Sequence, residues 1–410
     1  MVRVLYRRTN CAMNNARRLS PEALCTALAE ARSKTLAAAL DLSDAQWVMP
    51  YGVFIQPTAW DLSHIGWFAE FWLLRGPHQL NRDGFQEANR RPYFFDPDEH
   101  YDSSKVCHAD RWKMPLDPRE ELCGHLAEQL EAVQSHITNH GDDFDTRYFA
   151  HLALFHELMH VEALAWTRAE CRYPSPKGVA MPNVAKSTQI VVPLGEHRIG
   201  CSSTDEFAFD NEGEQVIAHG AFSIDSHPVR NDAFLAFVAD DGYSRPEFWS
   251  DHSSWPNHSS WPGHRLIGLG QMPTRWRRND AGDIEHRHYN QWLPLPLEQP
   301  VVHISAIEAE AYCRWAGRSL PTAAQWEIAT QHGMHWGNSV WEWTSTVFHP
   351  YPCFRPGPYV TYSAPWFHLQ REVRGGAYTT HALMHDARYR NFFLAGRCDA
   401  FTGFRTVSNG

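Results

Sequence analysis

The sequence lacks several features that would each define a class of protein. Its nine cysteines are scattered and never spaced C-x-x-C, which argues against a disulfide framework or a structural zinc cluster. No stretch approaches 18 apolar residues, and the amino-terminal segment lacks an apolar run followed by a small-residue cleavage site. There is no long run of one charge, and 37 basic and 47 acidic residues give a formal net charge of -10. We therefore expect a cytoplasmic protein that binds small molecules rather than nucleic acid or a membrane.

Helical periodicity dominates the first half of the 410-residue chain. Ser20 is placed as an N-cap with Pro21 at the first helical position, and apolar residues then recur at three-to-four spacing. Four such antiparallel helices make a bundle, a fold whose core commonly holds metal ions. The predicted helices lie within residues 20–43, 58–75, 119–137 and 145–170.

After a linker rich in proline and serine, the pattern changes to short strands separated by long loops. "QIVVPLG" and "EHRIGCS" are strand candidates, and "NDAFLAFVADDG" and "SAIEAEAYCRWAG" are the helix candidates. The whole chain is therefore predicted to be α+β, with an irregular second domain whose long loops are typical of functional sites. The predicted divisions are an extension (1–19), the helical bundle (20–170), the linker (171–189) and the second domain (190–410).

Histidines within the apolar stretch "FHELMHVEAL" indicate a metal site. His156 and His160 are four residues apart, so their imidazoles point to the same side of a helix. A divalent cation relieves both the repulsion of two protonated rings and the unmet hydrogen bonding of two neutral ones. His64 shares a helical stripe with large aromatic residues and is the candidate third ligand. Three imidazoles would leave positions open for catalysis, but the spacing does not choose between Zn, Cu, Fe and Ni.

Other residues of this segment are weaker candidates. His151 lies five positions before His156 and is therefore off the stripe. Glu157 and Glu162 do not share the face of both histidines, so we expect each to form salt bridges on the helix surface.

Motifs in both halves resemble a known family. "SHIGWFAEFWLL" and "HELMHVEAL" are similar to motifs of the ergothioneine-type sulfoxide synthases, whose first half is a DinB-like four-helix bundle. The second half resembles the formylglycine-generating-enzyme-like domain, of C-type-lectin-like fold, that follows the bundle in that family. The segments that carry this second resemblance are "PVVHISAIEAEAYCRWAGRSLPTAAQWEIAT" (300–330), "GNSVWEWTST" (337–346), "VRGGAYTT" (373–380) and "RNFFLAGRCDAFTGFRTV" (390–407).

The resemblance implies a mononuclear non-haem Fe(II) held by three histidines, which map to His64, His156 and His160. Enzymes of this family use O2 to join a chalcogen atom of one substrate to the imidazole carbon of hercynine, the trimethylated betaine of histidine. The product is an S-oxide or an Se-oxide. The substrates implied are hercynine, a thiol or selenosugar, and O2.

The chain departs from the sulfur enzymes at positions that contact substrates. Met159 stands where those enzymes commonly have a glutamine that touches the hercynine imidazole, and a thioether cannot donate a comparable hydrogen bond. Their R-N-W-D motif, with a later arginine, grips the zwitterionic γ-glutamylcysteine. Here Asn391 and Arg397 are kept, but Phe392 and Phe393 replace the tryptophan and the aspartate.

A neutral ring in place of a carboxylate removes the partner for a cysteine-type ammonium group, so γ-glutamylcysteine is not the expected donor. A sugar-like donor suits aromatic walls better. The segment "DEHYDSSKVCHADRWKMPLDP" (98–118) also resembles that of the selenoneine synthases, which take a selenosugar. We therefore predict an O2-dependent oxidoreductase of selenoneine biosynthesis that forms a carbon–selenium bond to hercynine.

The resemblance also suggests roles for further residues. Asn391 is the candidate contact to hercynine, and aromatic residues such as Phe392 and Phe393 would face its trimethylammonium group. The sulfur enzymes use a tyrosine as proton donor, for which Tyr359 is preferred over Tyr351 and Tyr362. Arg111 is a candidate substrate contact from the first half.

Three alternatives to this prediction stay open. The first is the same chemistry with a cysteine-type thiol, in ergothioneine biosynthesis. The second is a zinc-dependent thiol transferase of the DinB type, and the third is a second domain that only binds a ligand. Formylglycine generation is disfavoured, because Cys353 and Cys398 show no recognisable copper-binding motif.

Overall fold

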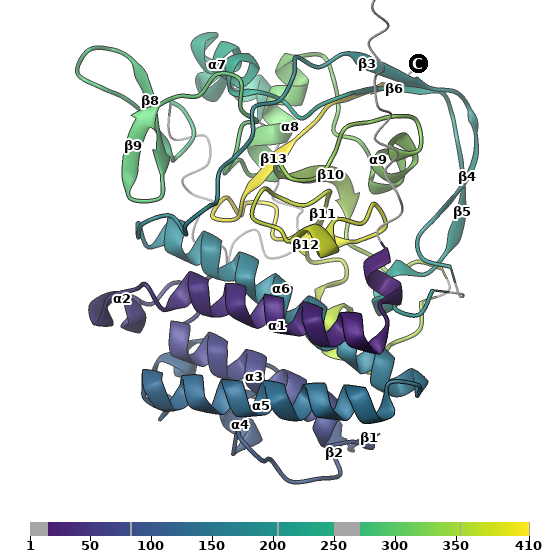
Figure 1. The fold of residues 1–410 in the computed structure, drawn as a ribbon. Helices are drawn as coiled ribbons and strands as arrows, with labels where there is room; N and C mark the ends of the chain where they lie inside the picture. The colour runs from purple at the N-terminus through teal and green to yellow at the C-terminus, as the bar shows by residue number, and fades with distance from the viewer. Residues whose placement is uncertain (1–14, 83, 203–204, 250–270, 353, 410) are drawn as a thin grey trace, which may run out of the picture.

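Four long helices form the amino-terminal half of the chain (Figure 1). The structure is a computed structural model, which describes residues 15–82, 84–202, 205–249, 271–352 and 354–409. Most of the predicted extension and Cys353 thus lie outside the described residues. α1 packs against α5 and α6, and α3 packs against the same two helices. The four are α1 (Pro21–Ala39), α3 (Thr58–Leu74), α5 (Arg119–His140) and α6 (Phe144–Glu170).

Local signals in the sequence set the helix ends. The Ser20 hydroxyl accepts the backbone N–H of Ala23, and Pro21 occupies the first helical position of α1, as predicted. The Asp143 carboxylate caps α6 in the same way, by accepting the N–H of Thr146 at 3.0 Å. The prediction of four long helices, with a bundle in the first half, is therefore confirmed.

α3 is buried around nearly its whole circumference. Its polar residues Asp61, His64 and Glu70 are each at most 3% exposed. Buried polar groups need partners, so this helix brings hydrogen-bonding chemistry into the bundle core. The shorter elements around it are α2 (Asp44–Val48), β1 (His78–Leu80), β2 (Gln86–Ala88), α4 (Asp98–Tyr101) and the 3-10 helices η1 (Asn15–Arg18) and η2 (His108–Trp112).

The second half combines several small sheets with three α-helices among its described residues. Its central sheet has the order β12-β11-β10-β13, in which only the β10–β13 pair is parallel. The strands of this sheet are β10 (Trp341–Val347), β11 (Arg371–Arg374), β12 (Asn391–Phe393) and β13 (Thr402–Phe404).

The other strands form the outer sheets β14-β6-β3, β4-β5 and β7-β8-β9. Both helix candidates of the sequence, 231–242 and 305–317, are helical, which confirms the α+β class. The helices are α7 (Asn231–Ala239), α8 (Ala306–Trp315) and α9 (Ala323–Thr330). The strands are β3 (Gln189–Val192), β4 (Gly195–Ile199), β5 (Gln215–His219), β6 (Phe222–Asp225), β7 (Trp276–Arg278), β8 (Ile284–His288), β9 (Gln291–Pro294) and β14 (Val407–Asn409).

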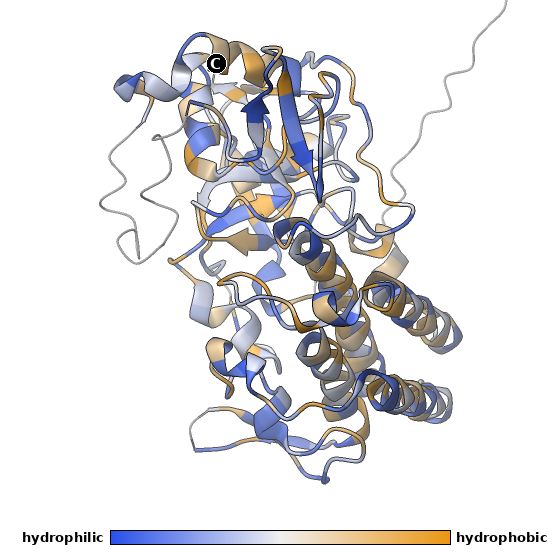
Figure 2. Ribbon diagram, turned by 90° about the vertical axis from the view of Figure 1, so that its left-hand side faces the viewer, coloured by the Kyte–Doolittle hydropathy of each residue, from blue (hydrophilic) through white to orange (hydrophobic). Residues whose placement is uncertain are grey.

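Helix α6 lies between the two halves. In Figure 1 it runs with α1 along the side of the bundle that faces the sheets, and the turned view in Figure 2 shows the bundle stacked below them. Near η1, Arg17 pairs with Glu212 at 2.5 Å and Asp386 at 2.9 Å, so a buried ion-pair network also joins the halves. Among the described helices, none combines the length and hydrophobicity that a bilayer crossing requires.

Candidate metal centre and substrate site

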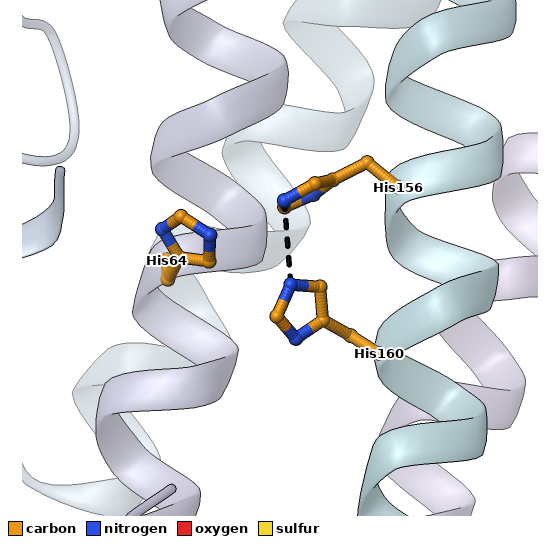
Figure 3. A group of neighbouring side chains, drawn as sticks. All are labelled: His64, His156 and His160. Atoms are coloured by element: carbon orange, nitrogen blue, oxygen red, sulfur yellow. Dashed lines mark hydrogen bonds between the residues drawn. The ribbon is translucent and has the colours of Figure 1, made fainter. Parts of the chain in front are cut away.

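Three histidines from two helices converge inside the bundle (Figure 3). His64 comes from α3, and His156 and His160 come from successive turns of α6. One candidate ligand atom from each ring lies within 4.8 Å of the other two. The ring centroids are 4.9 Å apart for His64 and His156, 5.1 Å for His64 and His160, and 4.5 Å for His156 and His160. The structure thus brings together the three residues predicted as metal ligands.

Hydrogen bonds behind the rings orient two of these imidazoles. Nδ1 of His64 lies 2.7 Å from the carbonyl oxygen of Tyr101, and Nδ1 of His160 lies 2.8 Å from the Asp61 carboxylate. Both oxygens only accept, so each Nδ1 carries a proton, and Nε2 is the nitrogen of each ring that could bind a metal. This arrangement of an imidazole with an acceptor behind it is typical of metal-binding histidines.

The charge state of the cluster also fits a cation. Nε2 of His156 lies 3.3 Å from Nε2 of His160. Burial lowers the pKa of His156 well below its usual value, and the neighbouring His160 and His64 lower it further. Burial, followed by His160, has the same effect on the pKa of His64. A divalent metal bound between the rings would replace the hydrogen bond between these two nitrogens, and a set of three imidazoles suits Fe and Zn alike.

Aromatic rings enclose the cluster on the bundle side. Trp60 stacks on His64 with ring centroids 4.8 Å apart, and Trp67 lies at 5.8 Å from the same ring. Phe68 stacks on His156 at 3.6 Å. These contacts hold the imidazoles in place and exclude water from their faces.

A small cavity of about 40 Å³ reaches His64 from the boundary of the two halves. Residues 102–104 and 358–361 line it, among them Tyr359. The Tyr359 ring lies 5.0 Å from Phe68 and 6.2 Å from His156, centroid to centroid. Burial raises the pKa of Tyr359 far above its usual value, so the phenol keeps its proton near neutral pH.

Met159 lies on the side of α6 that faces the second half. The Tyr389 hydroxyl lies 3.1 Å from its sulfur and the Tyr362 hydroxyl 3.7 Å, while the two hydroxyls are 3.1 Å apart. Met159 is thus held by two phenols next to His160. Sequence reasoning did not single out Tyr389, although it directly precedes the segment "RNFFLAGRCDAFTGFRTV" (390–407) that carries part of the family resemblance.

Arg111 approaches the cluster from η2. Its guanidinium lies over the Trp60 ring, 4.1 Å from the centroid, and Trp60 in turn stacks on His64. It donates to Gln56 Oε1 at 2.9 Å and to the Ser103 carbonyl at 3.3 Å. Its Nε is buried without a hydrogen-bond partner among the described residues.

The C-terminal candidates lie on and just after β12. The Asn391 side chain accepts the backbone N–H of Phe392 at 2.8 Å, and the Phe392 ring stacks on Phe348 at 4.1 Å. Phe392 also lies 5.8 Å from the Tyr362 ring. Through this contact β12 is connected to the phenols that hold Met159.

Arg397 and Phe393 form a closed group with Trp166 of α6. The Arg397 guanidinium lies 4.7 Å from the Phe393 centroid and 5.0 Å from that of Trp166, and Phe54 covers it at 4.9 Å. It also donates two hydrogen bonds to the Asp399 carboxylate, at 2.7 and 2.9 Å. Its charge is therefore already neutralised within the protein.

The expectation that Glu157 and Glu162 form salt bridges on the helix surface is wrong, because both side chains are buried. Glu157 pairs with Arg32 of α1 inside the bundle at 2.8 Å. Glu162 accepts hydrogen bonds from the Trp341 indole at 2.7 Å and the Thr380 hydroxyl at 2.8 Å, across the boundary with the second half. Burial raises the pKa of Glu162 to about 7. Their partners are distant in sequence, so the spacing of the carboxylates gave no sign of them.

His151 is structural. Its Nε2 accepts the Leu19 backbone N–H at 3.2 Å, and its Nδ1 bonds the Arg147 carbonyl at 2.8 Å. Sequence reasoning missed Asp61, which precedes His64 by one helical turn and supports His160. A buried carboxylate on the stripe of a candidate ligand is a signal that could have identified it.

Comparisons with known proteins match both halves. Residues 27–167 match the DinB superfamily, and residues 177–339 match the sulfatase-modifying factor enzyme 1-like domain. The hercynine oxygenase of Mycolicibacterium smegmatis is 28% identical over 94% of this chain and 99% of its own length, and that of Mycobacterium tuberculosis is 28% identical over 94% and 98%. The formylglycine-generating enzyme of Streptomyces coelicolor is 26% identical over 55% of this chain and 89% of its own.

Proposed function

Because the chain belongs to the family of the hercynine oxygenases, the ergothioneine-type sulfoxide synthases, we propose that it is an O2-dependent non-haem iron enzyme that joins hercynine to a selenosugar. In this reaction the imidazole C–H of hercynine and the Se–H of the sugar selenol are replaced by a C–Se bond. The two hydrogens leave with one oxygen atom as water, and the second oxygen atom remains on selenium. Four electrons from the two substrates thus reduce one O2.

The observation that carries the proposal is the set of three oriented imidazoles from His64, His156 and His160. Fe(II) fits this donor set, and when bound there it would activate O2 and offer positions to the chalcogen donor. In this proposal residues 20–170 hold the iron, and residues 190–410 supply most of the substrate contacts. Helix α6 contributes to both parts.

We assign the hercynine end to the space beside Met159 and β12. Met159 presents a thioether instead of a hydrogen-bond donor, and the Tyr362 and Tyr389 hydroxyls hold it in position. Phe392 lies 5.8 Å from the Tyr362 ring and Asn391 directly precedes it in β12, and aromatic faces are suited to a trimethylammonium group. Tyr359 keeps its proton and lies beside His156, so it is the proton donor in this proposal.

The contacts of Phe393 and Arg397 favour a sugar-like donor over γ-glutamylcysteine. An ammonium group would find the Phe393 ring where the sulfur enzymes have a carboxylate. A donor carboxylate would have to compete with Asp399, which already binds Arg397 with two hydrogen bonds. The unpaired Nε of Arg111 is the group that we assign to a hydroxyl of the donor.

A competition assay tests this function. Purified protein is loaded with Fe(II) and given hercynine, O2, and equal amounts of a selenosugar and γ-glutamylcysteine. We expect mass spectrometry to find the hercynyl selenoxide as the main product. Turnover with the cysteine peptide alone would reject the selenosugar and leave a sulfoxide synthase.

Anaerobic and metal-exchange controls separate oxidation from thiol transfer. The proposed enzyme should lose turnover without O2 and should lose it again when Zn²⁺ replaces Fe(II), because zinc has no accessible redox change. Equal activity of the zinc-loaded protein with and without O2 would instead indicate a DinB-type thiol transferase. The His156→Ala variant is the negative control in both assays.

A further inference from the structure

Arg17 lies in η1, before the bundle begins, and its side chain is buried between the two halves. Its guanidinium binds the Glu212 carboxylate through two nitrogens, at 2.5 and 2.9 Å, and its Nε lies 2.9 Å from Oδ2 of Asp386. Each carboxylate belongs to a tight turn closed by a backbone hydrogen bond of 3.1 Å, residues 209–212 (the Glu212 turn) and residues 386–389 (the Asp386 turn). One side chain from the start of the chain thus joins two turns that are far apart in the sequence.

The Glu212 turn supports the first of the two phenols that hold Met159. The Glu212 carboxylate accepts the backbone N–H of Phe209 at 2.8 Å, in addition to the bonds from Arg17. The Phe209 ring stacks on the Tyr362 ring with centroids 4.6 Å apart. Because one carboxylate binds both the guanidinium and this N–H, the position of the Phe209 ring depends on Arg17.

The Asp386 turn carries the second phenol. The Asp386 carbonyl accepts the backbone N–H of Tyr389 at 3.1 Å, and the Asp386 carboxylate accepts two hydrogen bonds from Arg388, at 2.7 and 2.9 Å. The Tyr389 hydroxyl then donates to the Met159 sulfur at 3.1 Å. Two separate lines of contacts therefore lead from Arg17 to Met159.

The packing around these turns leaves little free space. Arg17, Phe209, Asp386 and Tyr389 line a cavity of about 10 Å³, and Phe155 of α6 lines it as well. Such a cavity barely holds one water molecule. Since packed interiors transmit displacements, a shift of the guanidinium should move the rings beside it.

Arg17 keeps its charge in this setting. Burial alone would lower its pKa, but the Glu212 carboxylate, followed by Cys201 and Asp386, raises the pKa well above its ordinary value. Among the described residues Glu212 has no other ion-pair partner, whereas Asp386 also pairs with Arg388 at 2.7 Å. Loss of Arg17 would leave Glu212 as a buried unpaired carboxylate, which is strongly unfavourable. The Glu212 turn should therefore rearrange when Arg17 is removed.

We propose that Arg17 is a positioning residue for the hercynine end of the substrate site. It holds the two turns, the turns set the phenols of Tyr362 and Tyr389, and the phenols set the thioether of Met159. This inference rests on the proposed function, in which hercynine lies beside Met159. A purely structural Arg17 would affect the stability of the protein and leave hercynine binding unchanged.

Calorimetric titration of the Fe(II)-loaded full-length protein with hercynine, without O2, tests the proposal. We expect Arg17→Leu to raise the Kd about tenfold at unchanged iron content, because the wall of the site is misplaced. In steady-state assays the change should appear in KM more than in kcat. The control Arg230→Leu removes a buried guanidinium that pairs with Asp232 at 2.8 Å at the start of α7, and should keep the Kd. A lower melting temperature of Arg17→Leu with an unchanged Kd would overturn the proposal.

Oxidation of Met159 by hydrogen peroxide gives a second measurement that needs no substrate. Peptide mass spectrometry of the metal-free protein follows the sulfoxide at this residue. We expect several-fold faster oxidation in Arg17→Leu, since the phenols no longer hold the sulfur, and an unchanged rate in Arg230→Leu. Equal rates in Arg17→Leu and the unchanged protein would also overturn the proposal. If the unchanged protein binds no hercynine, the proposed function fails, while these rates still decide the role of Arg17.

The Arg17→Lys variant covers an Arg17→Leu variant that fails to fold. Lysine keeps the charge, but its single ammonium group lacks the planar fork with which the guanidinium spans both carboxylates. We expect shifts of about two- to threefold in the hercynine Kd and in the rate of Met159 oxidation, in the same directions as for Arg17→Leu. If Arg17→Leu does not fold, values for Arg17→Lys equal to those of the unchanged protein would overturn the proposal.

Discussion

The two sides of α6 differ in what they do with polar side chains. Toward α3, His156 and His160 face a third imidazole, and the acceptor behind His160 leaves its inner nitrogen free for a metal. Toward the second half, Met159 and Glu162 are held by hydroxyl and indole donors of that half. One side thus carries the imidazoles that we assign to a metal ion, while the other joins α6 to the groups that we assign to substrate. The comparison teaches that metal binding and substrate selection can be altered separately.

Removal of a predicted metal ligand should have the largest effect on activity. This effect should be confined to the side of α6 that faces α3. His156→Ala leaves two imidazoles and a gap under Phe68, so we expect loss of bound iron and no detectable turnover. Iron content measured by elemental analysis, together with the product assay, checks this. Because Glu162 and the second half are untouched, far-UV circular dichroism should be unchanged, and an iron-replete active variant would remove His156 from the ligand set.

Loss of an ion pair between the halves should lower the free energy of unfolding without changing metal binding. Burial alone would raise the pKa of Asp386, but the guanidinium groups of Arg17 and Arg388 lower it to about 2. The carboxylate therefore contributes stability above its ordinary pKa of about 3.9, and this contribution is lost as the pH falls toward 2. Asp386→Asn should cost about 1–3 kcal/mol at neutral pH, since it removes one of the two carboxylates that pair with the buried Arg17, which keeps its pair with Glu212.

Urea denaturation of the Asp386→Asn variant between pH 2 and pH 7 measures that effect. Its stability should vary less with pH below 4 than that of the unchanged protein. If the free energy of unfolding of the two proteins varied with pH in parallel, Asp386 would have the same pKa in the folded and unfolded states.

Substitutions of Glu162 test only the side of α6 that faces the second half. Glu162→Ala leaves the Trp341 indole and the Thr380 hydroxyl without their buried acceptor, so we expect a loss of about 1–3 kcal/mol in the free energy of unfolding. Glu162→Gln keeps an acceptor oxygen and should recover much of the loss. Iron affinity should stay within experimental error in both variants, and a large drop would show that the two sides of α6 are not independent.

Substitution of Asp61 provides the matching test for the side of α6 that faces α3. Asp61→Asn keeps the size of the side chain but weakens the acceptor behind His160, so iron affinity should fall about 10–100-fold. Competition with a chelator of known affinity measures this change. The free energy of unfolding of the metal-free protein should change much less, and an unchanged iron affinity would assign Asp61 a purely structural role.

The smallest effect is expected from Met159→Gln. This change restores a hydrogen-bond donor toward the substrate half and leaves the imidazoles in place. We expect a several-fold change in KM for hercynine and little change in iron affinity, on the scale of one hydrogen bond, about 1 kcal/mol. Steady-state kinetics with varied hercynine checks it, and loss of iron from the variant would contradict the separation of the two sides.

Sequence reasoning reached the parts of the site that depend on local periodicity. The four-residue spacing of His156 and His160 and the aromatic stripe around His64 are properties of single helices, and the structure brings these residues together. The N-cap of α1 was predictable for the same reason. These signals need no knowledge of tertiary packing.

The parts that sequence reasoning missed all involve contacts between distant segments. The Tyr101 carbonyl behind His64, the Tyr389 hydroxyl on Met159 and the Trp341 indole on Glu162 each lie more than 30 residues away from their partner. Carboxylates are rarely buried, so the burial of Glu162 contradicts the expectation that its helix position gave, a salt bridge on the helix surface. The pair of Tyr101 and His64 depends on the packing of α4 against α3, and the other two pairs depend on the docking of the two halves.

The position of α6 at the boundary has a consequence for how such an enzyme changes over time. Substitutions in loops and strands of the second half can change the groups that we assign to the substrates without moving the imidazole cluster, because that cluster is supported from α3 and α4 on the opposite side. Neither half could be exchanged as a free-standing module, since α6 carries two of the three clustered histidines and also contacts the second half through Met159 and Glu162. New specificities in this architecture should therefore arise by single substitutions at the boundary between α6 and the second half, rather than by exchange of whole domains.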